Sequence, residues 1–182
     1  MLTMKTREFL ILSECTREDI QAKISRLERP SSVCGVSVPN DLNSLTLGEL
    51  LRLQTIQTEE DALLIPCKVI LGLPKEKVMN AEASEVFGFL MWVSREMETI
   101  NKLFERTRVP PTKEEKEAGV ESLNFGAFGL IDWYARRMGY IYHEAVEHVK
   151  WPIIYKCLEM DAMQTMYERR LREVYNNKMS NK

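Results

Sequence analysis

The chain has 182 residues and an almost balanced charge, with 25 Lys and Arg against 27 Asp and Glu. A hydrophobic share of 45% and a charged share of 29% are typical of a folded globular protein with one domain, or one domain and an appendage. The lack of a basic excess argues against a nucleic-acid partner. No run approaches the ~20 apolar residues of a membrane span, and the first residues do not resemble a signal peptide, so we expect neither a membrane partner nor export.

The four cysteines are far apart in the sequence and form no Cys-x-x-Cys pair. Their neighbours are mostly apolar, which favours small buried side chains with free thiols over metal ligands or disulfides. Free thiols fit a reducing cytosol. The four are Cys15, Cys34, Cys67 and Cys157.

The first forty residues predict short elements. Residues 5–12 are rich in Phe, Leu and Ile and fit either a strand or the edge of a helix. Residues 16–19 (TRED) have the pattern of a capping box, which would open a helix that runs to about Leu27. Residues 30–40 have a proline near each end and alternating valines, which indicates a loop with a short edge strand.

Two further capping boxes follow, at residues 46–49 (TLGE) and 58–61 (TEED). The first predicts a helix whose inner face is formed by Leu47, Leu50, Leu51 and Ile56. The second opens an apolar run over residues 62–73 that Pro66 should kink or restart, because proline lacks the amide donor. The glycine and proline at residues 72–74 then end it.

Residues 84–106 predict the best-defined helix of the chain. Apolar residues recur there at alternating steps of four and three, the spacing of a coiled-coil seam. We expect this stripe to be largely buried, because these steps keep side chains on one face. It consists of Val86, Leu90, Val93, Met97, Ile100 and Phe104.

Residues 107–119 contain two prolines and a charged run without apolar periodicity, which is typical of a linker. The predicted organisation is therefore an N-terminal helical domain (1–106), a linker (107–119) and a smaller C-terminal helical part (120–182). The predicted fold class is mainly α, with short strands allowed near the N-terminus.

The C-terminal part predicts three helical segments. In the first, one face is formed by Phe128, Ile131, Tyr134, Ala135 and Met138, and Gly139 ends the helix. Residues 143–149 predict a short helix or turn. Proline is well tolerated in a first helical turn, so residues 151–152 should start the last long helix. Its four-and-three stripe, which only Gln164 interrupts, is Ile153, Cys157, Met160, Tyr167, Leu171 and Val174.

Catalytic chemistry finds little support in the sequence. Residues 143–148 (HEAVEH) suggest a metal site, but two zinc-binding histidines on one helical face stand four apart, and these are five apart. No nucleophile elbow or phosphate-binding loop is present. We therefore expect no enzyme and no catalytic, cofactor-binding or metal-ligating residues. The rival interpretation is an unfamiliar site at His143, Glu144, Glu147 and His148.

Large apolar side chains are the better candidates for binding. Trp133 lies off the predicted inner face of its helix, where it would contact either another part of the chain or a partner. Tryptophan often anchors interfaces, and methionine-rich faces adapt to irregular partners but also fill cores. The predicted partner-binding residues are Trp133, Trp151, Met163 and Met166.

The order of these segments resembles that of the tail assembly chaperones of long-tailed phages. The strings that carry the resemblance are residues 45–53 (LTLGELLRL), 128–134 (FGLIDWY) and 144–152 (EAVEHVKWP), together with the apolar helices of residues 59–73 and 84–104. The resemblance implies a small helical protein that binds the coiled-coil tape-measure protein while tail-tube subunits assemble. Residues before Leu45 match no part of it.

The expected function is thus that of a non-enzymatic phage morphogenesis protein without cofactors. Its partners would be phage structural proteins of the tape-measure or tail-tube type, and self-association is left open. The expected location is the host cytoplasm. The alternative is a permanent virion component, such as a connector, ring or internal cargo protein, located in the virion.

Overall fold

A computed structural model describes residues 4–15 and 26–180. The described chain is mainly α-helical, which confirms the predicted fold class. It forms two compact units, Met1–Thr99 and Ile100–Lys182, and the division falls inside a long helix rather than within residues 107–119. None of the helices in the described part combines the length and the apolar character needed to cross a membrane.

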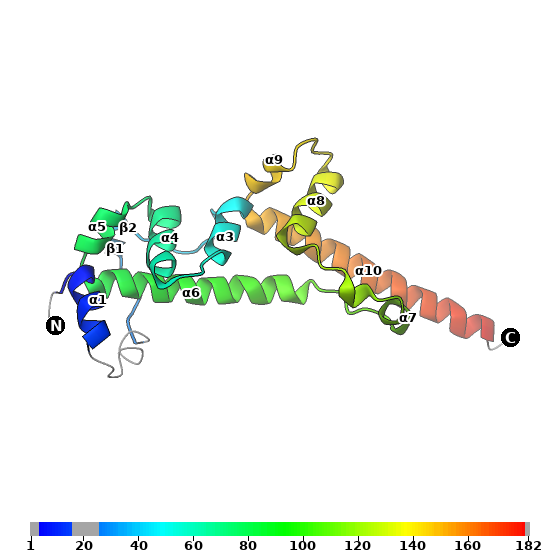
Figure 1. Ribbon diagram of the computed structural model, residues 1–182. Coiled ribbons are helices and arrows are strands. Elements are labelled where there is room, and N and C mark those ends of the chain that lie inside the picture. The colour runs from blue at the N-terminus through cyan, green and yellow to red at the C-terminus, as the bar shows by residue number, and fades with distance from the viewer. Residues whose placement is uncertain (1–3, 16–25, 181–182) are drawn as a thin grey trace. The chain divides into compact units, whose positions relative to one another are not determined.

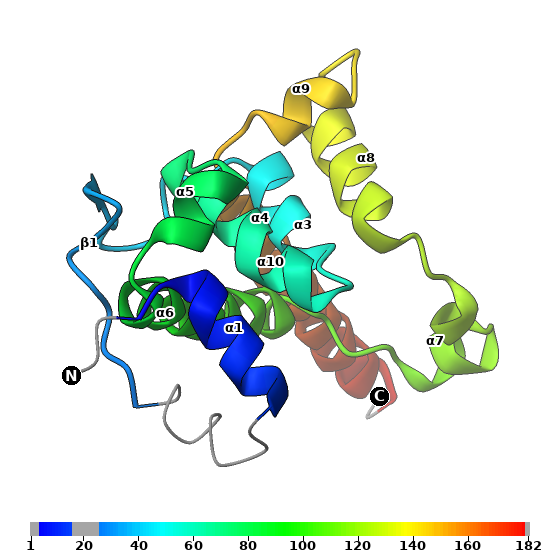
Figure 2. The same ribbon diagram turned by 60° about the vertical axis from the view of Figure 1, so that its left-hand side comes forward.

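The first unit is built from short helices and one small hairpin around the beginning of the long helix. Figures 1 and 2 show α3, α4 and α5 over one side of α6. In chain order the elements are α1 (Thr6–Cys15), β1 (Ser32–Val33), β2 (Val36–Ser37), α3 (Leu47–Gln54), α4 (Glu59–Leu71), α5 (Lys75–Asn80) and α6 (Ala83–Arg106).

The threonines of the predicted capping boxes do begin α3 and α4. Thr46 accepts a hydrogen bond from the backbone N–H of Glu49, whose carboxylate accepts one from the Thr46 N–H in return. Thr58 accepts from the N–H of Asp61 in the same way. Gly72 ends α4 with φ of 66°, a conformation that favours glycine. Pro66 lies inside α4 without ending it.

The core of the first unit includes most of the predicted inner face of α3. Leu47 and Leu50 are buried, as expected. The third buried residue is Leu53, while Leu51 is half-buried and Ile56 lies beyond the end of α3 and is exposed. The prediction was wrong only for Ile56, because α3 ends at Gln54 before reaching it.

Residues 5–12 belong to a helix, α1, and not to a strand. Thr6 is fully buried, and both its N–H and its hydroxyl donate to the carbonyl of Ala81, at 2.9 and 3.2 Å. The rings of Phe9 and Phe87 pack with centroids 4.7 Å apart, which fixes α1 on α6. The predicted capping box at residues 16–19 lies outside the described residues.

The predicted loop of residues 30–40 contains the β1–β2 hairpin, in which Val33 pairs with Val36. Arg29 holds the segment that follows. Its guanidinium donates to the carbonyls of Val38 and Pro39, both at 2.9 Å, and lies over the Trp92 ring at 5.3 Å. Each of these contacts is within the first unit, so they position the hairpin segment against α6.

The predicted stripe of α6 is inward-facing but is not the whole inner face. Val86, Val93 and Ile100 are buried, and the other three members are half-buried. Phe89 and Trp92 lie outside the stripe and are 0% and 8% exposed. The helix therefore buries a wider face than a two-helix seam requires, as expected of a helix with several neighbours.

The cysteines do not share one environment. Cys67 is fully buried, as predicted, but Cys34 is exposed and Cys157 is half-buried; the side chain of Cys15 is outside the described residues. Burial raises the pKa of the Cys67 thiol to about 12. Cys34 is exposed because it occupies the hairpin turn, with φ of 50°. Its thiol donates to the carbonyl of Lys77 at 3.3 Å, and partial desolvation also raises its pKa.

This difference predicts selective alkylation. At pH 8 in native buffer, iodoacetamide should label Cys34 and leave Cys67 unmodified, because only an accessible thiolate reacts and a pKa of about 12 leaves almost none at Cys67. In denaturant both should be labelled. Mass spectrometry of tryptic peptides measures each site, and native labelling of Cys67 as fast as Cys34 would show that the first unit opens readily.

The second unit contains the remaining elements and the last residues of α6. They are α7 (Lys113–Glu117), the 3-10 turn η1 (Val120–Ser122), α8 (Gly126–Met138), α9 (Glu144–Glu147) and α10 (Trp151–Ser180). The last three agree with the predicted helical segments. Residues 107–119, which were predicted to be a linker, include α7.

Candidate interaction surface

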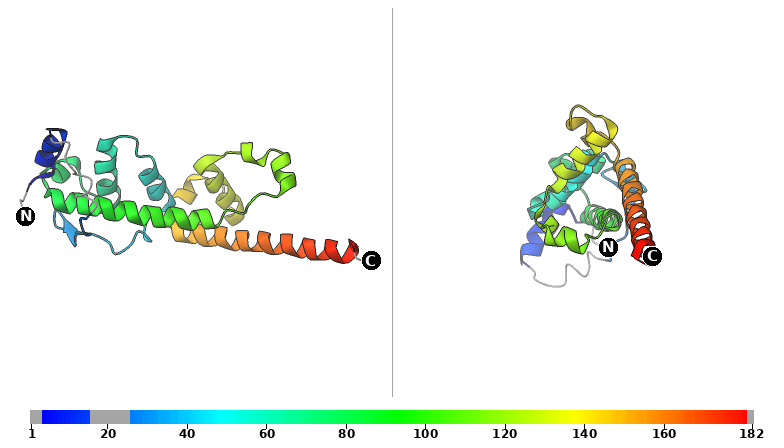
Figure 3. Two further views of the ribbon diagram at one scale, coloured as in Figure 1. Left: turned by 90° about the horizontal axis from the view of Figure 1, so that it is seen from below. Right: turned by 90° about the vertical axis from the view of Figure 1, so that its right-hand side faces the viewer.

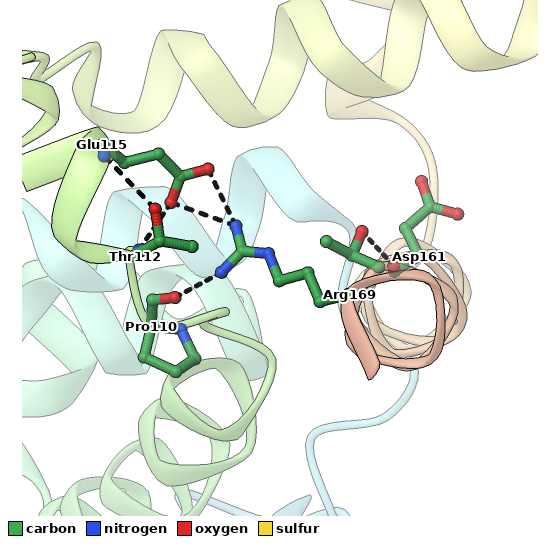
Figure 4. Close-up of polar contacts among 6 residues, drawn as sticks. Pro110, Thr112, Glu115, Asp161 and Arg169 are labelled. Carbon is green, nitrogen blue, oxygen red and sulfur yellow. Dashed lines mark hydrogen bonds and ion pairs between the residues drawn. The ribbon is translucent and has the colours of Figure 1, made fainter. Parts of the chain in front are cut away.

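Helix α7 is fixed to α10 by a single arginine. Thr112 and Glu115 form a capping box at the start of α7, with the Thr112 N–H donating to the Glu115 carboxylate at 2.8 Å. Arg169 of α10 donates to both oxygens of that carboxylate, at 2.9 and 3.1 Å, and to the carbonyl of Pro110 at 2.6 Å (Figure 4). The charged segment thus packs on one face of α10.

Helix α8 buries the middle of its predicted inner face and exposes the ends. Ile131, Tyr134 and Ala135 are buried, whereas Phe128 and Met138 are 60% and 50% exposed. These two end residues are more exposed than the predicted inner face implies, although the His143 ring packs on Phe128. They contribute instead to an apolar surface.

A hydrogen bond fixes α9 to α8. His143, the residue before α9, lies with Nε2 3.1 Å from Oδ1 of Asp132, and its ring packs on Phe128 at 5.1 Å. The hydrogen bond with His143 lowers the pKa of Asp132; partial desolvation opposes this shift, and Arg136 adds to it at 2.8 Å. The pair positions the connection between the two helices.

That connection carries two strongly exposed apolar side chains. Ile141 is 85% and Tyr142 is 72% exposed. We use the name α8–α9 surface for the exposed apolar residues on α8 and on the connection to α9. They are Phe128, Met138, Tyr140, Ile141 and Tyr142.

The two tryptophans predicted as partner anchors lie in different settings. Trp133 is half-buried, its ring 6.0 Å from that of Tyr134 and beneath the guanidinium of Arg137 at 5.8 Å. Trp151 is only 3% exposed and packs against the rings of Phe104 and Tyr155. Trp151 is therefore a core residue in this structure, and its role in partner binding stays a prediction.

The other two predicted binding residues, Met163 and Met166, are 67% and 37% exposed on α10. They belong to a much larger apolar exposure along this helix, which Figure 3 shows as one uninterrupted element. The predicted stripe of α10 is also exposed at most positions, with only Cys157 half-buried. The exposed apolar residues of α10 are Ile153, Met160, Met163, Met166, Tyr167, Leu171, Val174, Tyr175 and Met179.

The residues of the rival enzymatic interpretation are not brought together as a metal site. His143 is bonded to Asp132 of α8, while His148 is exposed beyond the end of α9. Within residues 4–15 and 26–180, no group of three or more His, Cys, Asp or Glu side chains has the geometry to hold a metal ion. The second unit does expose large apolar side chains, on α8, on the α8–α9 connection and on α10.

Comparisons of the chain with protein-family models, with curated proteins and with solved structures found no match.

Proposed function

We propose that the chain is a non-enzymatic morphogenesis protein of a tailed phage, similar in role to a tail assembly chaperone. The observation that supports this most directly is the α8–α9 surface, where Ile141 and Tyr142 are 85% and 72% exposed. Large exposed apolar side chains that occur together mark interaction sites, because leaving them in water is unfavourable. The assembly role itself rests on the resemblance to phage chaperones.

The proposed partner is an apolar helical segment of a phage structural protein, such as the tape measure. An amphipathic helix binds through side chains spaced by one turn, and an exposed aromatic and aliphatic pair can fit between them. Trp133 lies on α8, half-buried, with part of its ring accessible to such a partner. A partner of this kind would need to be kept soluble until assembly.

The test is affinity capture from infected cells with the tagged full chain. The wild type should capture phage structural proteins, and the double variant Ile141→Ser, Tyr142→Ser should lose them. Glu147→Ser, an exposed polar position on α9, is the matched control and should capture them as the wild type does. Capture of metabolic enzymes alone, or equal capture by all three, would contradict the proposal.

The protein content of purified phage particles distinguishes an assembly chaperone from a permanent virion component. A permanent virion component should appear by mass spectrometry in a fixed copy number per particle. A chaperone should be missing from mature particles while present in infected cells. The same capture surface would serve in either role.

A further inference from the structure

Helix α10 has two faces with different surroundings. One is covered within the chain and recurs at steps of four and three, with every member buried or half-buried. Its contacts in the second unit include Phe104 against Tyr155 and Glu115 against Arg169. The members of this covered face are Trp151, Tyr155, Leu158, Ala162, Thr165 and Arg169.

The opposite face is the α10 seam, which follows the same steps two residues out of phase. Two residues correspond to a rotation of about 200° around a helix, so the α10 seam points away from the covered face. Its d positions are Ile153, Met160, Tyr167 and Val174, and its a positions are Cys157, Gln164 and Leu171. The d residues are 52%, 57%, 59% and 50% exposed.

We propose that α10 forms a parallel, in-register coiled coil with α10 of a second copy of this chain. A heptad pattern over three repeats is the spacing at which two helices bury a shared apolar seam. Within the described chain most of the α10 seam is exposed, while Cys157 at its beginning is half-buried, and the spacing of the seam matches that of a second helix with the same period. This goes beyond the proposed function, because it uses a surface separate from the α8–α9 surface.

The charges beside the seam favour a second copy in the parallel orientation. The g positions carry bases, Lys156 and Arg170, and no acid; the e positions carry acids, Asp161 and Glu168, and no base. A parallel pair brings each g position near the e position five residues later in the other copy, so Lys156 meets Asp161. In the single chain these two side chains pair with Glu159 and Arg137, and the dimer would exchange those exposed or half-buried ion pairs for the one between copies. An antiparallel pair brings g positions near g positions and e positions near e positions, which places like charges side by side.

Gln164 favours the same arrangement. It is the one polar residue of the α10 seam, and it lies at an a position. In a parallel in-register dimer its amide faces the same amide of the second copy, where the two can hydrogen-bond. In the single chain its amide donates to Glu168 at 3.0 Å. In an antiparallel dimer it would face an apolar d residue in place of the same amide, and burying an amide against apolar surface is costly. A polar a residue is a known determinant of register in coiled coils.

Sedimentation velocity of the full chain over a range of concentrations tests the association. The wild type should show a monomer–dimer equilibrium. Tyr167→Lys, at the centre of the seam, should raise the dimer Kd by at least about tenfold, since burying a lysine there costs free energy. Asn176→Lys, which adds the same charge at an exposed position off the seam, should leave the Kd unchanged.

Oxidative crosslinking of Val174→Cys tests the orientation. Peptide mapping should find residue 174 linked to residue 174 of the other copy. A monomer at every concentration, equal Kd values for the two lysine variants, or a link from residue 174 to Cys157 instead would overturn the proposal. Tyr167→Lys should still capture the partners of the wild type, so a failure of self-association and a failure of the proposed function give different results.

Discussion

Replacing Phe89 with alanine should lower the free energy of unfolding of the first unit by ~3–5 kcal/mol. Phe89 is 0% exposed on α6, and its ring centroid lies 5.9 Å from that of Trp92. The loss combines the transfer free energy of the removed ring with the cavity left behind. Because a domain of this size has only ~5–15 kcal/mol of stability, the unfolding midpoint in urea should fall clearly.

Glu98→Ala, at an exposed position on the same helix, is the control and should change stability by no more than about 0.5 kcal/mol. Circular dichroism measures the unfolding of both variants. Tryptophan fluorescence should respond as well, because Trp92 is the neighbour of the deleted ring. If the two variants unfold at the same urea concentration, the buried face of α6 has been assigned wrongly.

The helices of this chain were largely predictable, because their ends are marked by local chemistry. Thr46 and Thr58 accept hydrogen bonds from the first N–H groups of their helices, and Gly72 and Gly139 adopt the left-handed conformation that ends one. These signals act over four residues and do not depend on tertiary packing. Helix α7 has the same signal, from Thr112 to Glu115, but it is short and its residues lack the apolar periodicity that marks the other helices.

Which face a helix buries was less predictable. The seam spacing of α6 located Val86 and Val93 in the core but missed Phe89 and Trp92. Seam spacing describes contact with one parallel or antiparallel helix, whereas α6 is covered by α1 and by the segment that Arg29 holds. Several neighbours bury a broader face than one periodic stripe describes.

In α10 the apolar stripe was predicted from its spacing, but whether another part of the chain covers it could not be predicted. A stripe indicates that some apolar surface will be covered and does not say by which chain. The covered face contains small or polar members, Ala162, Thr165 and Arg169, so it does not stand out as a stripe. The contact of Arg169 with Glu115 spans 54 residues of sequence, and no local pattern predicts it.

Substitutions of two adjacent isoleucines can distinguish buried from exposed positions on α10. Ile154 is 0% exposed, whereas Ile153 is 52% exposed on the α10 seam. Ile154→Ala should destabilise the second unit by ~2–5 kcal/mol, because a buried side chain is removed from a packed site. Ile153→Ala should change the stability of the monomer by no more than about 0.5 kcal/mol. Both changes alter helix propensity equally, so the difference between them reports burial alone.

The two isoleucine variants should rank in the opposite order in their effect on dimerisation. At a concentration where the wild type is partly dimeric, Ile153→Ala should weaken the dimer, because it removes a d residue at the first layer of the seam. Ile154→Ala should leave dimerisation intact at temperatures where the second unit stays folded. Urea unfolding at low protein concentration gives the first comparison, and sedimentation velocity gives the second. Equal losses in both measurements would mean that the two faces of α10 are not distinct.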